Sequence, residues 1–157
     1  MKTKLLSFVG TGGYKVCTYE YSGIRSQPTK FAQVALTELL VSQEVDVDEI
    51  LVFVTDAAWE KHGAELGEEL KQFEPDVQHR FVPIADKVTA ERIWSFFDEI
   101  YKEIGENERI FFDITHGFRS YPLTVVPILQ YARELNQIKI GGIFYGNYEA
   151  SWKEEPE

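Results

Sequence analysis

The chain has 157 residues, of which 44% are apolar and 27% are charged, and this is the composition of an ordinary globular protein. It contains no apolar run of the roughly 18 residues that a membrane span needs. The apolar stretch behind the basic first residues ends at Gly10, which is too early for a signal peptide. The single cysteine, Cys17, excludes a disulfide framework and a multi-cysteine zinc site. The sequence therefore predicts a cytoplasmic protein of one domain's length.

The net charge of −10, from 16 basic and 26 acidic residues, argues against binding to long nucleic acids or to anionic membranes. Residues 1–30 hold five basic residues against Glu20 alone, a net charge of +4, whereas the other 127 residues hold 11 basic and 25 acidic ones, a net charge of −14. The five basic residues are Lys2, Lys4, Lys15, Arg25 and Lys30. This distribution predicts a locally basic corner that can bind a small, compact polyanion.

The first third of the chain predicts two strands, a helix and a third strand. An apolar run over residues 4–9, stopped by glycines, predicts a buried strand. Residues 16–21 are β-branched and aromatic, so they predict a second short strand that can pair with the first as a hairpin. A proline-threonine pair opens a helix over residues 28–42, and an apolar run over residues 49–55 predicts the next strand.

Helices and strands alternate in the rest of the chain. We expect helices over residues 57–73, 89–104 and 121–135, and strands over residues 77–84, 108–114 and 138–145. Apolar strands that alternate with helices predict an α/β fold, a mainly parallel sheet with helices on both faces. Ligands of such sheets bind outside the carboxyl ends of the strands. Function is therefore expected in the segments that follow strands: residues 10–15, 55–59, 113–121 and 145–148.

The loop after the first strand reads Gly10-Thr11-Gly12-Gly13-Tyr14-Lys15. Glycines after a strand let backbone N–H groups approach phosphate oxygens. The dinucleotide fingerprint G-x-G-x-x-G would need glycine at Lys15, and the P-loop pattern is absent. The loop is therefore either a tight glycine-rich turn or a site for a phosphate-type ligand, and the sequence favours neither.

The segment Thr55-Asp56-Ala57-Ala58-Trp59 joins a predicted strand to a predicted helix. Capping of the helix N-terminus is enough to explain Asp56. Trp59 either stacks on a base near the ligand edge or plugs the core, and the second alternative is favoured.

The segment from Asp113 to Pro122 gathers hydrogen-bonding side chains between a predicted strand and a predicted helix. Asp113 is expected to be mainly structural, holding the amides of the loop. His116 can exchange a proton near neutral pH, and Arg119 offers a planar fork for phosphate. Neither side chain has an obvious task in the core, so function is expected for both.

The remaining histidines and the cysteine are not expected to take part in function. The three histidines share no metal-ligand spacing, and His62 and His79 are assigned to surface elements. Cys17 is expected to be an inert core residue. The sequence predicts no metal site and no cofactor.

The residues Asp113-Ile114-Thr115-His116-Gly117 match the D-x-T-H-G motif of CRISPR-associated proteins that carry a CARF domain. The glycine loop that opens at Gly10, the strand end at residues 54–58 and the segment of residues 141–150 also resemble that family. The resemblance therefore covers nearly the whole chain.

This resemblance implies a Rossmann-like CARF fold over residues 1–150, followed by a short acidic tail at residues 151–157. It implies a homodimer that binds a cyclic oligoadenylate, the messenger of type III CRISPR antiviral defence, across its two-fold axis; cyclic tetra-adenylate is the commonest ligand in the family. The expected ligand-binding residues are Gly10, Thr11, Gly12, Gly13, Tyr14, Thr55, Asp56, Trp59, Thr115, Gly117 and Phe118.

CARF proteins of this kind usually continue into an effector domain, often a HEPN nuclease, but the R-x-x-x-x-H pattern of such sites is absent here. Stand-alone CARF proteins resemble ring nucleases, which cleave the cyclic messenger without metal by attack of a ribose 2′-OH. For that activity the expected catalytic residues are His116, Arg119 and Lys15, with Thr11 and Tyr14 orienting the ribose. A sensor domain without catalysis is the alternative. A third alternative is a nucleotide-binding Rossmann protein outside CRISPR. The mismatch to the dinucleotide fingerprint at Lys15 disfavours it.

Overall fold

A computed structural model describes residues 1–73, 75–85, 92–116 and 121–146 of the chain. Its main feature is a five-stranded sheet in the order β5-β4-β1-β6-β7, in which every neighbouring pair is parallel. The strands are β1 (Thr3–Val9), β4 (Glu49–Val54), β5 (Gln78–Pro83), β6 (Arg109–Asp113) and β7 (Lys139–Phe144). The predicted α/β fold is therefore confirmed.

Helices cover both faces of this sheet. They are α1 (Ala32–Ser42), α2 (Asp56–Ala58), the π-helical turn η1 (Trp59–Gly63), α3 (Ala64–Phe73), α4 (Ile93–Tyr101) and α5 (Tyr121–Leu135). Successive residues of a strand face opposite sides, so Leu5 packs in the cluster with α1 and α3, whereas Leu6 packs with α4 and α5. In the described part of the chain, no helix is both long enough and apolar enough to cross a membrane.

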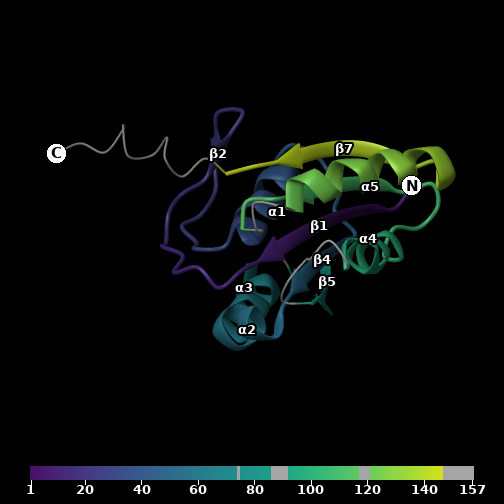
Figure 1. Cartoon of the computed structure of the whole chain (residues 1–157). Coiled ribbons are helices and arrows are strands. Elements are labelled where there is room, and N and C mark those ends of the chain that lie inside the picture. Colours follow the sequence, from purple (N-terminus) through teal and green to yellow (C-terminus); the bar gives the residue numbers. More distant parts are fainter. Residues whose placement is uncertain (74, 86–91, 117–120, 147–157) are drawn as a thin grey trace.

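The order of the strands fixes the place where a ligand can bind. From β1 the chain runs to β4 and β5 on one side, and it then crosses to β6 and β7 on the other. The strand order therefore reverses between β1 and β6, and the crevice outside the carboxyl ends at such a point is the usual ligand site. Figure 1 shows the carboxyl ends of β1 and β7 on one side of the molecule and the N-terminus on the opposite side.

The predicted hairpin between residues 4–9 and 16–21 is wrong. The second strand is shorter, β2 (Glu20–Tyr21), and it pairs antiparallel with β3 (Ile24–Arg25) in a separate two-stranded sheet. Ser22 and Gly23 between them have φ angles of 52° and 79°, as a tight two-residue hairpin turn requires. The Ser-Gly pair was thus a turn signal that the prediction did not use.

Cys17 is not a core residue, contrary to expectation. It lies outside the named strands, forms an isolated antiparallel bridge with Thr29, and is half-buried.

The helix predicted over residues 57–73 is interrupted by the π-turn η1. A side chain at Gly63 would place its Cβ 2.2 Å from the Trp59 ring, so the ring lies directly on the glycine backbone. Such turns occur often at functional sites. The turn brings Lys61 and His62 toward the loop that follows β1.

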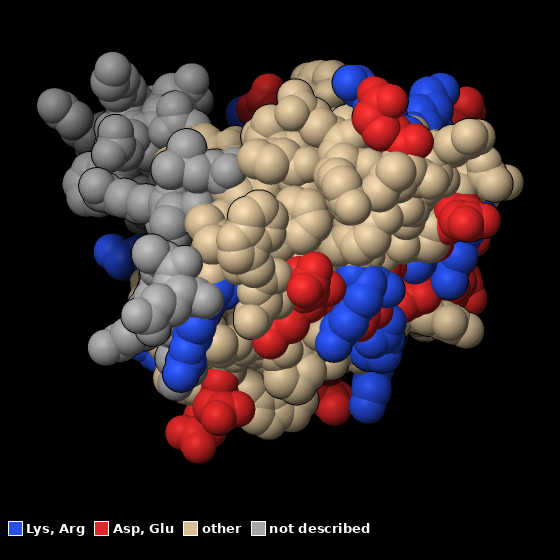
Figure 2. Space-filling model, turned by 45° about the vertical axis from the view of Figure 1, so that its right-hand side comes forward, with Lys and Arg blue, Asp and Glu red and all other residues tan. Residues whose placement is uncertain are grey.

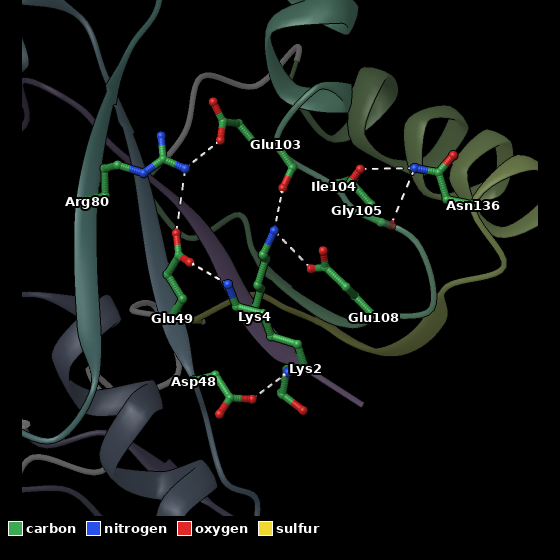
Figure 3. A network of polar contacts seen from close by, with 11 residues as sticks. Lys2, Lys4, Asp48, Glu49, Arg80, Glu103, Ile104, Gly105, Glu108 and Asn136 are labelled. Carbon is green, nitrogen blue, oxygen red and sulfur yellow. Dashed lines mark hydrogen bonds and ion pairs between the residues drawn. The ribbon is translucent and has the colours of Figure 1, made fainter.

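A network of polar contacts lies at the amino ends of the strands (Figure 3). Lys4 is almost buried; its Nζ lies 2.9 Å from Glu108 Oε2 and donates a hydrogen bond to the Glu103 carbonyl at 2.9 Å. Gly105 makes room for this pair, since a Cβ there would lie 1.9 Å from Glu108 Oε1. Lys2, in contrast, forms an exposed ion pair with Glu49 at 3.0 Å.

We expect Lys4→Ala to lower the free energy of unfolding by about 3 kcal/mol, because Glu108 is left as a buried charge without its partner. Lys2→Ala is the matched control, since an exposed pair contributes less than about 1 kcal/mol. Urea unfolding of the two variants measures the difference. Equal losses would mean that Lys4 and Glu108 are effectively solvated.

Candidate functional site

Hydrogen bonds of the buried Asp113 carboxyl link β1, β6 and β7 near the carboxyl edge of the sheet. Its Oδ2 accepts a hydrogen bond from Ser7 Oγ of β1 at 2.7 Å, and its Oδ1 accepts from the Thr115 N–H at 3.0 Å and from Thr115 Oγ1 at 2.5 Å. Thr115 Oγ1 in turn accepts from the Gly146 N–H, just beyond β7, at 2.8 Å. Burial raises the pKa of Asp113, and these hydrogen bonds oppose that rise.

The imidazole of His116 completes the N-terminus of α1. Its Nε2 accepts the N–H of Ala32 at 3.3 Å, where the capping residue Phe31 offers no side-chain acceptor. An accepting Nε2 places the ring proton on Nδ1. Burial, and after it the neighbouring His62, lowers the pKa of His116 to about 4. His116 is therefore a neutral group at physiological pH.

The Tyr14 ring lies between two histidines. Its centroid is 3.9 Å from that of His116 and 4.7 Å from that of His62. The Tyr14 hydroxyl accepts the Gly10 N–H at 2.7 Å. Burial raises the pKa of Tyr14, so the side chain stays a neutral phenol.

Two consecutive residues of the π-turn hold two consecutive carbonyls of the glycine loop. Lys61 Nζ donates to the Thr11 carbonyl at 2.6 Å, and His62 Nε2 donates to the Gly12 carbonyl at 2.8 Å. We call these two contacts the carbonyl clamp. In a planar trans peptide the N–H points opposite to the carbonyl, so the clamp turns the N–H groups of Gly12 and Gly13 away from the π-turn. This is how a loop presents amides to an anion.

His62 is a site residue that the sequence prediction missed. It was assigned to a surface element, but its side chain is only 4% exposed. The helical pattern over residues 57–73 gave no sign of the π-turn, which is what directs this side chain inward. The position of His62 in the first turns of a helix that follows a strand end was the one available signal.

The glycines of the loop differ in what surrounds them. A Cβ at Gly10 would lie 2.9 Å from the His116 carbonyl oxygen, and a Cβ at Gly12 would lie 2.9 Å from the Tyr14 ring. Gly13 has no heavy atom within 4 Å of such a Cβ. Gly10 and Gly12 are therefore needed for close packing, whereas Gly13 lies in open space.

The strand end at β4 differs from its prediction in two respects. Thr55, not Asp56, caps α2, with Oγ1 accepting the Ala58 N–H at 3.2 Å, and Asp56 is exposed. Trp59 does not plug the core, because it is 47% exposed and meets Phe81 edge to face at 4.8 Å. Stacking of Trp59 on a ligand stays a prediction.

The predicted basic corner is wrong. Four of its five basic residues are paired with acids, and only Lys15, exposed in the glycine loop, forms no ion pair among the described residues. The pairs are Lys2–Glu49, Lys4–Glu108, Arg25–Glu20 and Lys30–Glu65. Figure 2 likewise shows Lys and Arg side chains intermingled with Asp and Glu on the face it presents. A charge sum over residues 1–30 could not reveal this, because three of the four acidic partners, Glu49, Glu65 and Glu108, come from distant segments.

Some predicted residues lie outside the described part of the chain. They are Gly117, Phe118 and Arg119 of the motif loop, and the predicted tail at residues 151–157. Among the described residues, no three His, Cys, Asp or Glu side chains form a group that could hold a metal ion.

The doubly wound parallel sheet, with a glycine loop and an acid-anchored loop at the point of strand reversal, defines a Rossmann-like α/β protein with a ligand site at its carboxyl edge. The family model described as "CRISPR system endoribonuclease Csx1, CARF domain" matches residues 4–149. The chain is also 36% identical, over 62 residues, to the CRISPR-associated protein MJ1674 of Methanocaldococcus jannaschii. That alignment covers 38% of this chain and 10% of the relative's length.

This chain belongs to the CARF-domain family of CRISPR-associated proteins. CARF domains bind cyclic oligoadenylates, and membership therefore implies a role in sensing these molecules within a CRISPR system.

We expect Asp113→Ala to lower the free energy of unfolding by about 3 kcal/mol, because Ser7 and Thr115 both lose a buried acceptor. Thr115→Val should cost about half as much, and Thr115→Ser, which keeps the hydroxyl, should restore most of the stability. Chemical unfolding of the three variants tests this order. A Thr115→Ser variant as unstable as Thr115→Val would show that the hydroxyl is not the bridging group.

We expect the imidazole of His116 to titrate at about pH 4 in NMR spectra of its ring protons. The unfolded chain takes up this proton near the ordinary pKa of 6.5, so the folded state binds fewer protons between these two values. The free energy of unfolding should therefore fall as the pH is lowered through this window, by on the order of 3 kcal/mol from this group.

His116→Phe is the control for that pH dependence. Asp113, whose raised pKa acts in the opposite direction, is present in both proteins, so the difference between their stability curves isolates His116. Parallel curves for the two proteins, or titration of His116 near its ordinary pKa, would contradict the prediction.

Proposed function

We propose that this chain binds a cyclic oligoadenylate, cyclic tetra-adenylate first, between residues 10–15 and residues 113–119. The carbonyl clamp supports this proposal most directly, since it turns the Gly13 amide away from the π-turn, on the loop whose Tyr14 ring contacts the neutral His116. Fixed dipoles of this kind can bind phosphodiesters without a cluster of cations. A cyclic ligand with two-fold symmetry suits a homodimer in the cytoplasm, in which each copy supplies the same loops.

We further propose that the bound ring is cleaved without a metal ion. The 2′-oxygen of one ribose attacks the phosphorus of its own 3′-phosphodiester, and a new O2′–P bond forms as the P–O5′ bond breaks. The 2′-hydroxyl gives up its proton, and the departing 5′-oxygen takes one up. The products end in a 2′,3′-cyclic phosphate and a 5′-hydroxyl, and no water is consumed. The protein's tasks are to hold the attack in line and to stabilise the charge that develops.

Four side chains are proposed for these tasks. Lys15 and Arg119 supply positive charge to the phosphate oxygens. His116 donates a hydrogen bond through Nδ1, since its Nε2 is engaged with Ala32. Thr11 orients the ribose, whereas the Tyr14 ring is held against His62 and His116 and is not available for that task in the unliganded chain.

The alternative function is a sensor that binds the ring and leaves it intact. One observation favours it: a neutral His116 whose Nε2 already accepts the Ala32 N–H is poorly placed to act as a general base or acid.

Incubation with cyclic tetra- and hexa-adenylate in EDTA, followed by mass spectrometry, tests both alternatives. Linear products that end in 2′,3′-cyclic phosphate are the expected result. Lys15→Ala, His116→Ala and Arg119→Ala should each slow cleavage at least about tenfold, the effect of one lost charge-assisted contact.

Lys139→Ala serves as the matched control, because it removes an exposed lysine from the start of β7, at the amino edge, and should leave cleavage unchanged. Tight binding without products would assign the chain to the sensor class. If neither ring binds, the proposed function is wrong.

A further inference from the structure

Tyr14 occupies a slot between two flat rings. The Tyr14 and His62 rings are stacked, with an angle of 25° between them, and the His116 ring lies against Tyr14 with a tilt of 30°. Phe31 meets Tyr14 and His62 edge to face, with centroids 6.4 and 5.7 Å away, and closes the inner side. Rings arranged in this way provide a stacking site of the kind that holds a nucleobase.

The edge of this slot carries polar groups of complementary kinds. The Gly10 N–H donates to the Tyr14 hydroxyl at 2.7 Å. The backbone N–H groups of Gly10 and Gly12 both face that oxygen, and both lower the pKa of Tyr14 against the effect of burial. His62 Nδ1 is buried and has no hydrogen-bond partner among the described residues. Adenine offers ring nitrogens that accept and an amino group that donates, which are the two kinds of group these atoms need.

We infer that Tyr14 fills an adenine-binding slot in the unliganded chain, and that the base of the ligand must displace it. This inference rests on the proposed function and adds a gate to it. Displacement of the phenol frees the Gly10 N–H and one face of each imidazole. An entering adenine can therefore replace the hydrogen bond and the ring contacts that the phenol loses. Tyr14 then competes with the ligand from within the chain. The apparent affinity equals the intrinsic affinity multiplied by the fraction of molecules in which the slot is open.

The loop is built so that Tyr14 can leave while the clamped residues before it stay in place. The carbonyl clamp holds Thr11 and Gly12, two residues before Tyr14. Gly13 lies between the clamp and Tyr14 and has open space around it. Rotation of the backbone at Gly13 can therefore move the phenol out without breaking the clamp.

Equilibrium binding of cyclic tetra-adenylate to Tyr14 variants tests the inference. We expect Tyr14→Ala to bind about tenfold more tightly than the wild type, and Tyr14→Phe, which keeps the stacking but loses the hydroxyl, to gain less. Tyr131→Ala, on α5, is the control for loss of a tyrosine. Weaker binding by a folded Tyr14→Ala would overturn the inference and make Tyr14 a contact of the ligand or a latch for the loop.

Fluorine NMR of protein labelled with 3-fluorotyrosine reports the position of Tyr14 directly. Saturation with ligand should move the Tyr14 resonance, identified by its absence in Tyr14→Phe, to the position of an exposed tyrosine. Without ligand, Gly12→Ala should do the same, because its Cβ would lie 2.9 Å from the ring, whereas Gly13→Ala should not move the resonance. A Tyr14 resonance that does not shift at saturation would overturn the inference.

Failure of the proposed function can be told apart from failure of the gate. If the wild type binds neither cyclic tetra- nor hexa-adenylate, the proposed function fails, and AMP becomes the probe. Binding of AMP to Tyr14→Ala but not to the wild type would then still support a closed adenine slot. Absence of AMP binding to both would overturn the slot as well.

Discussion

The hydrogen bonds of the buried Asp113 carboxyl position the rest of the site. They join Ser7 of β1 to Thr115 after β6, and Thr115 carries the link to Gly146 after β7. The loop that begins at Thr115 is thereby fixed against the strand from which the glycine loop departs. His116, the next residue, is then held beside the start of α1 by its hydrogen bond with Ala32 and by its contact with the Tyr14 ring. A carboxyl is costly to bury, and three hydrogen bonds offset that cost.

The site beyond this anchor is assembled from neutral groups. Tyr14, His116 and the backbone amides of the glycine loop carry no net charge at physiological pH, and among the described residues the cations of this loop and of the clamp are Lys15 and Lys61. Lys61 is already engaged with a carbonyl. An acidic protein can therefore bind a compact anion through oriented dipoles and stacking, which act at short range, rather than through a field that its own carboxylates would cancel.

The sequence was sufficient for the five strands of the main sheet and for the presence of the main helices, because apolar runs and glycine punctuation are local signals. It failed where the outcome depends on contacts between distant residues. The acids that pair with Lys2, Lys4 and Lys30 could not be known before the chain was folded. His62 was missed for a related reason: a π-turn changes the direction of a side chain without changing the helical pattern. The Ser22-Gly23 turn, in contrast, was readable and was overlooked.

The neutral state of His116 follows from its place rather than from its sequence context. Protonation would put a donor on Nε2 opposite the N–H of Ala32 and a positive charge at the positive end of the α1 dipole. Both effects act with burial to disfavour the charged imidazole. The same bond means that a ligand which drew Nε2 away would leave the first amide of α1 unpaired. His116 is therefore better suited to present Nδ1–H to a phosphate from a fixed position than to shuttle a proton. The positive charge that stabilises a reacting phosphate at this edge must therefore come from Lys15 and from groups other than the His116 imidazole.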